Sequence, residues 1–189
     1  MLSKTHLPTA STALFLCLIF TALIYYPGLS GGFVFDDFAN LLLNEKLNIE
    51  TLNTNSLLSA SFSSNAGVLK RPISMFSFAL NNYFSGQNPY SYKVVNLVIH
   101  LLTGVGMFLL TRLILQHYHK IRQIVLEPSL LYWLPLFVSF IWLIHPINLS
   151  SVLYIVQRMT SLAGLFTIFG ICIYIWGRSK QLENNNKGG

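Results

Sequence analysis

Two adjacent aspartates, Asp36 and Asp37, are the residues of this sequence best suited to chemistry, and they follow the apolar residues 33–35. A carboxylate there can act as a general base, bind a divalent cation or accept a hydrogen bond from an incoming hydroxyl group. The pair can equally begin a solvated loop or cap a helix that starts at Phe38. Because neighbouring side chains diverge, we expect only one of them to point into a site.

Basic side chains that could meet a phosphate stand at two other places. Arg71 follows Lys70 and precedes a helix that we expect from Pro72 onwards, and a guanidinium group can hold a phosphate with two parallel hydrogen bonds. Contact with anionic lipid headgroups is the alternative, and we favour it for Lys70. Arg158 could anchor a lipid phosphate or could reach the membrane interface as an ordinary boundary arginine. His145 ends an apolar segment nearby, and no resident metal site is predicted.

The composition predicts what must position these residues. Hydrophobic residues make up 53% of the chain and charged residues only 10%, whereas soluble domains carry about 25% charged residues. Since so few charges cannot cover a water-facing surface, we predict an all-α, multi-pass integral membrane protein in contact with the lipid bilayer. Its basic residues flank apolar segments and form no stripe with interleaved aromatics, which argues against a nucleic-acid partner.

Apolar segments long enough to span a bilayer, at about 20 residues each, predict four transmembrane helices. The first could instead be a cleaved signal peptide, but its apolar stretch exceeds the usual length of about 7–15 residues, which favours a retained anchor. The predicted spans are residues 9–27, 92–115, 130–145 and 159–177. Between and beyond them lie tail 1–8, external loop 28–91, cytoplasmic loop 116–129, external segment 146–158 and a disordered tail 178–189.

The placement of lysine and arginine predicts the orientation. The N-terminal tail, the loop 116–129 with the end of its preceding span, and the C-terminal tail all carry basic residues, and basic loops stay cytoplasmic. Both termini are therefore expected in the cytoplasm, which leaves the two aspartates, Arg71 and Arg158 on the outer side.

The long external loop is expected to contain short amphipathic helices. Ile73, Phe76, Leu80 and Phe84 recur at helical spacing, and their apolar face suits the membrane interface. In the second span every fourth residue from Tyr92 is polar or small. This stripe, which comprises Tyr92, Asn96, His100 and Gly104, predicts a helix face turned towards other helices or a cavity.

Several segments together resemble one family. In order, these are an apolar helix, then GGFVFDD, then RPISMFSFALNNYFSGQNPYSYKVVNLVIHLL, then HPINLSSVLYIVQRMTSLAGLF. They resemble the N-terminal part of type C glycosyltransferases, in particular membrane O-mannosyltransferase-like proteins with tetratricopeptide repeats, including bacterial homologues. The resemblance covers about residues 25–176.

The resemblance implies a function and a site. An acidic residue of the first external loop would be the catalytic base, which corresponds to Asp36 or Asp37. The donor would be a polyprenyl-phosphate-linked sugar and the acceptor a protein or glycan, with Arg71, His145 and Arg158 near the donor phosphate. A bacterial inner membrane is the implied location, and the aspartates leave open a divalent cation as cofactor.

The chain departs from the family in one respect. Members have ten or more spans followed by soluble repeats, whereas this sequence carries four spans and no repeat. We therefore expect a fragment, a truncated product or a degenerate relative, whose activity on its own is uncertain. A non-enzymatic membrane scaffold is the second hypothesis, in which the aspartates cap a helix and the polar stripe packs helices. A catalytic module should fold the external loop so that an aspartate, Arg71 and Arg158 converge.

Overall fold

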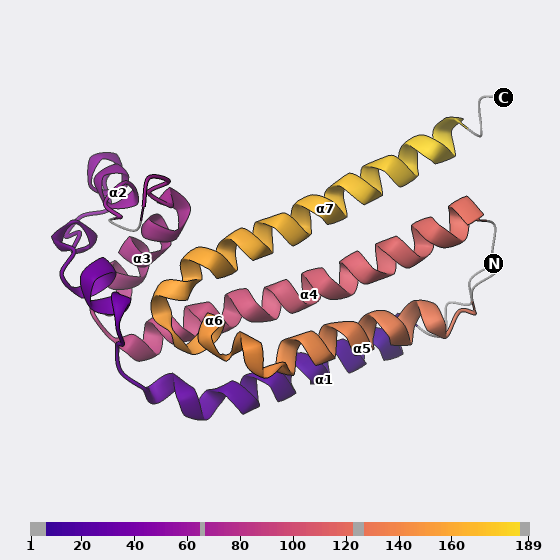
Figure 1. Cartoon of the computed structure of the whole chain (residues 1–189), viewed down its shortest axis with the longest axis horizontal. Coiled ribbons are helices and arrows are strands. Elements are labelled where there is room, and N and C mark those ends of the chain that lie inside the picture. Colours follow the sequence, from indigo (N-terminus) through magenta and orange to yellow (C-terminus); the bar gives the residue numbers. More distant parts are fainter. Residues whose placement is uncertain (1–6, 65–66, 123–126, 186–189) are drawn as a thin grey trace. The chain divides into compact units, whose positions relative to one another are not determined.

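The computed structural model describes residues 7–64, 67–122 and 127–185, and most of these are helical with no β-strand among them (Figure 1). Long apolar helices alternate with short helical segments of the 3-10, π or α type. In chain order the elements are α1 (Leu7–Tyr25), η1 (Tyr26–Ser30), η2 (Phe38–Leu42), η3 (Glu45–Leu47), α2 (Thr54–Ser61), α3 (Pro72–Ser85), α4 (Pro89–Arg122), α5 (Leu130–Ile144), η4 (Pro146–Asn148), α6 (Leu149–Leu153), η5 (Ile155–Gln157) and α7 (Arg158–Asn185).

Within the described residues, three stretches of helix are long and apolar enough to cross a membrane: Ser11–Ser30, Pro89–His119 and Ile155–Leu182. A fourth is obtained if α5 and the bent continuation Pro146–Leu153 count as one span. The all-helical prediction is confirmed for the described residues, and the predicted four spans agree with the upper of these two counts.

The helix ends differ from the prediction at the C-terminal end of the chain. Residues 178–189 were expected to be disordered, yet α7 continues through Asn185. The residues from Arg178 to Glu183 are mostly good helix formers, and the guanidinium group of Arg178 donates to the side chain of Gln181 at 2.8 Å. The last four residues, like residues 1–6, lie outside the described part.

The chain divides into two compact units. One, here called the loop unit, comprises Ile24–His100 and Pro146–Ala163. The other, here called the stem unit, comprises Met1–Leu23, Leu101–His145 and Gly164–Gly189. The long helices α4 and α7 each begin in the loop unit and continue in the stem unit.

A hydrophobic core holds the loop unit together. Met75, Phe78 and Ala79 on α3 are fully buried in it, and α2 lies beside α3 (Figure 1). The helix predicted from Pro72 is thereby confirmed. However, the residues expected on its apolar face, such as Ile73 and Phe84, are exposed. Helix α3 is therefore apolar on two faces, one packed in the core and one open.

Close contact between helices marks the stem unit. At Gly104 of α4, an added Cβ atom would lie 2.5 Å from Leu143 of α5, and the Ser139 hydroxyl group donates to the Gly104 carbonyl at 2.7 Å. Gly104 thus allows α4 and α5 to pack closely, which explains why a small residue stands at this position of the stripe.

Candidate functional site

Asp37 is a fully buried carboxylate that fastens the external loop to a distant segment. Its Oδ2 accepts a hydrogen bond from the Val34 N–H group at 3.0 Å, within the same turn. Its Oδ1 accepts one from the Val156 N–H group at 2.8 Å. Since the two partners are about 120 residues apart in sequence, Asp37 holds the loop against η5, the segment just before α7.

The surroundings of Asp37 have opposing effects on the pKa of its carboxyl group. Burial raises the pKa of its carboxyl group above the ordinary value, while the bonded N–H groups of Val34 and Val156 and the charge of Lys93 act to lower it. Lys93 is buried as well, and its Nζ donates to the Gly31 carbonyl at 2.8 Å. In the sequence, Lys93 stands near the start of the predicted span 92–115. A buried lysine within an apolar helix is itself a signal of function or structure.

Asp36 lies differently from its neighbour, because its side chain is exposed. Its backbone N–H group donates to the Tyr154 hydroxyl group at 3.1 Å. Burial raises the pKa of Tyr154, and the charges of Asp36 and Asp37 raise it further. Of the two aspartates only Asp36 presents its carboxylate to solvent. That only one of them points into a site stays a prediction.

The backbone just before Asp36 is strained. Phe35 has a φ of 44°, in the left-handed region that bulky residues rarely adopt. Its ring is exposed and meets the Tyr154 ring edge-on, with 6.3 Å between the centroids. Strain of this kind persists only where the surroundings enforce it, and it clusters at functional sites.

Arg158 is completely buried, and each of its N–H groups has an acceptor. Its Nε donates to Asn96 at 2.7 Å, and one terminal nitrogen donates to Asn81 and to the Tyr92 carbonyl, both at 2.8 Å. The other reaches the carbonyl and hydroxyl oxygens of Ser77 at 3.3 and 3.4 Å. The guanidinium group also stacks 4.4 Å from the Phe78 ring centroid.

These contacts make Arg158 the tie between α3, α4 and α7. All its acceptors are uncharged, and a guanidinium group has five N–H donors, all of which are used here. A bound phosphate would have to displace some of these hydrogen bonds. Binding of a donor phosphate by Arg158 therefore stays a prediction, and it requires that some of these hydrogen bonds break.

Arg71 is exposed and close to the same segment. Its guanidinium group donates to the Met159 sulfur at 3.2 Å, a weak acceptor that leaves most of the donor capacity unused. Lys70 and Arg71 have φ values of 52° and 43°, so two consecutive left-handed residues precede Pro72. The turn thus holds Arg71 at the start of α3 in a strained conformation.

His145 is exposed and caps the end of α5, where its N–H group donates to the Trp142 carbonyl at 3.3 Å. It belongs to the stem unit, whereas the aspartates, Arg71 and Arg158 belong to the loop unit. A part for His145 in the same site stays a prediction.

The polar stripe of α4 is confirmed as a buried face. Tyr92, Asn96 and His100 are 2%, 0% and 3% exposed. The Asn96 amide donates to the carbonyl groups of Val152 and Ile155 at 3.3 and 3.2 Å while its oxygen accepts from Arg158. The stripe therefore orders the segment that precedes α7.

Three contacts of the external loop converge on residues 154–159. Asp36 meets Tyr154, Asp37 meets Val156 and Arg71 meets Met159. The loop is folded onto this segment, with an exposed carboxylate and an exposed guanidinium group on it. That an aspartate, Arg71 and Arg158 line one cavity stays a prediction. Among the described residues, no group of three or more His, Cys, Asp or Glu side chains could hold a metal ion.

This arrangement defines an all-helical protein with three or four candidate apolar spans and an acidic loop folded on the start of α7. Three similar proteins are human protein O-mannosyl-transferases: TMTC3 is 26% identical over 85% of this chain, TMTC4 29% over 84% and TMTC2 29% over 80%. The predicted resemblance to O-mannosyltransferase-like glycosyltransferases is confirmed.

The similarity concerns a small part of those relatives. It covers 16%, 22% and 17% of TMTC3, TMTC4 and TMTC2, so the chain spans less than a quarter of their length. No family model matches the chain, and no solved structure matches it. Tetratricopeptide repeats and a bacterial origin stay predictions.

Proposed function

We propose that this chain is a membrane module of a glycosyltransferase that moves a sugar from a polyprenyl-phosphate-linked donor to a protein or glycan hydroxyl group. The observation that carries the proposal is the exposed carboxylate of Asp36 on a loop folded against α7, in a chain similar to protein O-mannosyl-transferases. The loop unit faces the outer side of the membrane, which is a bacterial inner membrane, and both termini are cytoplasmic.

Asp36 is the general base. Its carboxylate takes the proton of the acceptor hydroxyl group, and the acceptor oxygen forms a bond to the anomeric carbon of the sugar. The bond between that carbon and the phosphate oxygen breaks, and the lipid phosphate leaves with the electron pair. Arg71, whose guanidinium group has one described hydrogen bond, to the Met159 thioether, stabilises the negative charge that develops on the phosphate.

Asp37 positions the base and does not touch the acceptor. The hydrogen bond that it accepts from Val34 closes the turn that carries Asp36, and the one from Val156 ties this turn to η5. The Asp36 backbone N–H group donates to the Tyr154 hydroxyl group. Catalytic groups must be held within a small tolerance by their supporting contacts, which is the task of Asp37 here.

A membrane scaffold without catalysis is the alternative, and one observation favours it. Arg158 and Asp37 are both fully used in holding the loop unit together, which a scaffold also needs. The two functions differ in Asp36, because the enzyme needs its carboxylate as a base and the scaffold does not.

The test is sugar transfer by membranes that contain the natural full-length protein, with polyprenyl-phosphate-linked mannose and a nucleotide-linked mannose supplied in parallel. We expect transfer from the lipid-linked donor only, and we expect Asp36→Asn to reduce it at least a hundredfold. Equal transfer by wild type and Asp36→Asn would leave the scaffold as the better account.

A further inference from the structure

Helices α4 and α7 enclose a groove in the stem unit. They touch at Gly106, where an added Cβ atom would lie 2.9 Å from Ile168, and again where His117 Nδ1 and the Ser179 hydroxyl group lie 2.8 Å apart. Between these contacts is a hollow of about 420 Å³. The contacts are 11 residues apart on α4, roughly 16 Å at 1.5 Å per residue.

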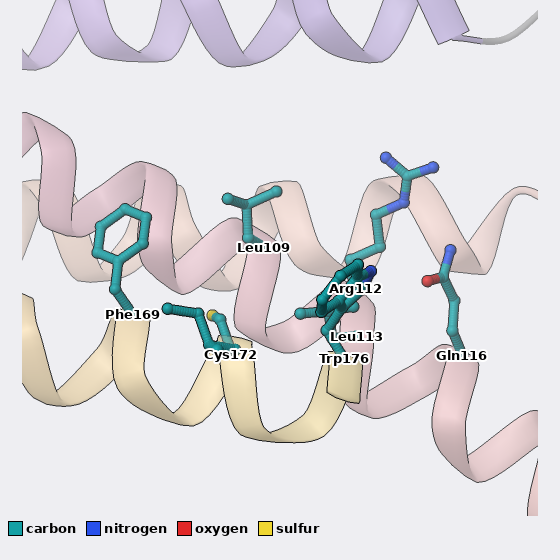
Figure 2. Close-up of a pocket in the computed structure, with 8 residues that line it drawn as sticks. Leu109, Arg112, Leu113, Gln116, Phe169, Cys172 and Trp176 are labelled. Atoms are coloured by element: carbon teal, nitrogen blue, oxygen red, sulfur yellow. The ribbon is translucent and has the colours of Figure 1, made fainter. Parts of the chain in front are cut away.

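The lining of the groove is almost entirely apolar. Figure 2 shows Phe169 at one end, Leu109 and Cys172 in the middle, and Gln116 at the other end. Leu113, Ile173 and Trp176 complete the apolar lining. The Cys172 sulfur makes only a long contact of 3.8 Å to the Gly106 carbonyl. A groove with so few polar partners is a poor site for water and a good one for a hydrocarbon chain.

One end of the groove is basic. Residues 112–122 of α4 and 176–181 of α7 contain basic residues and no acidic ones, and the first acidic residue of α7 is Glu183. The Lys180 ammonium group lies 4.7 Å from the Trp176 ring centroid. The Arg112 guanidinium group lies 5.3 Å from the Tyr132 ring centroid. In Figure 2 the guanidinium group of Arg112 points away from Cys172 and Phe169.

Both cations keep hydrogen-bond donors for an anion. Stacking on an aromatic ring engages the face of the guanidinium group and leaves its N–H edge open. Trp176 is 53% exposed at this end, and tryptophan favours the boundary between hydrocarbon and headgroups. Basic pockets between membrane helices are suited to anionic lipid headgroups.

We propose that this groove binds one anionic phospholipid, with an acyl chain along Leu109 and Ile173 and its phosphate beside Arg112, Gln116 and Lys180. The proposal rests on the membrane placement given under the proposed function, and it names a site separate from the sugar-transfer site. The lipid fills the hollow that the side chains leave between α4 and α7 and thereby steadies the stem unit.

Native mass spectrometry of the detergent-purified chain tests the proposal, with phosphatidylglycerol and phosphatidylcholine of identical acyl chains as competing probes. We expect retention of a single phosphatidylglycerol about tenfold over phosphatidylcholine. The double variant Arg112→Gln, Lys180→Gln should lose this preference, and Ile173→Trp, which fills the exposed side of the groove, should lose binding of both lipids. Lys46→Gln, which removes one positive charge in the loop unit, should behave as wild type.

Three results would overturn the proposal: no preference in the wild type, an unchanged preference in the double variant, or displacement of the lipid by free glycerol phosphate. Variants are compared only where their unfolding temperature matches that of the wild type. The charge-conserving double variant Arg112→Lys, Lys180→Arg should keep the preference for phosphatidylglycerol. Recovery of the chain without detergent in the soluble fraction would instead contradict the membrane placement. A membrane-bound chain without lipid preference contradicts this inference alone.

Discussion

Asp36 and Asp37 are adjacent in the chain, yet they have opposite surroundings. One carboxylate is exposed, and the other is completely enclosed and bonded to two backbone N–H groups. A buried acceptor that satisfies two N–H groups is costly to remove, because the donors would be left without partners. At the scale of single residues, the site therefore consists of one group available for chemistry and one that supports it.

The raised pKa of Asp37 makes the stability of the protein depend on pH. The folded-state pKa lies above the unfolded-state value of about 3.9. The carboxyl group therefore contributes its full stabilisation of the folded state at pH values below the unfolded-state pKa. This stabilisation is lost as the pH rises through the folded-state pKa. Unfolding midpoints measured in detergent from pH 3.5 to 8 should show the wild type losing stability relative to Asp37→Asn as the pH rises. If the wild type instead became more stable relative to Asp37→Asn as the pH rises, the raised pKa would be contradicted.

Arg158 is predicted to be intolerant of lysine. An ammonium group has three donors on a flexible stem and cannot serve the acceptors that surround Arg158, so Asn81, Asn96 or Tyr92 would lose its partner. Arg158→Lys should destabilise the loop unit by about 3 kcal/mol, measured by denaturant unfolding in detergent. Arg178→Lys, at an exposed arginine bonded to Gln181, is the matched control and should change little.

At the scale of elements, the approach of α4 and α5 depends on the absence of a side chain at Gly104. Its added Cβ atom would meet Leu143 at 2.5 Å, and overpacking of this kind costs about 1–3 kcal/mol. Gly104→Ala should therefore lower the unfolding temperature. Gly170→Ala adds the same methyl group where nothing lies within 4 Å and should cause no loss. Equal effects of the two substitutions would show that α4 and α5 do not pack here.

Periodicity and hydropathy predicted the elements well but not their contacts. The long apolar segments, the helix from Pro72 and the buried stripe of α4 all follow from local patterns. The enclosure of Lys93 and the five-donor network of Arg158 do not, because their partners come from segments distant in sequence. Arg158 was accordingly interpreted as a ligand-binding or boundary arginine, whereas its contacts are those of a core residue.

At the scale of the whole molecule, the predicted orientation can be tested by chemical labelling. Ser59→Cys lies in the external loop and Arg122→Cys at the end of α4, and both positions are exposed. In intact cells a membrane-impermeant maleimide should label Ser59→Cys, and it should label Arg122→Cys only after lysis. The native Cys17 and Cys172 lie in apolar helices, so the wild type should remain unlabelled. The reverse pattern would place the loop unit in the cytoplasm.

The two aspartates have different tasks, one as the base and one as its support, and one paired measurement tests this difference. Asp36→Asn and Asp37→Asn are made in the natural full-length protein, and sugar transfer and unfolding temperature are measured on both. Asp36→Asn should abolish transfer at an unchanged unfolding temperature, since its side chain is exposed, whereas Asp37→Asn should alter the stability and reduce transfer together. Full transfer by Asp36→Asn, or loss of stability in that variant alone, would contradict the account.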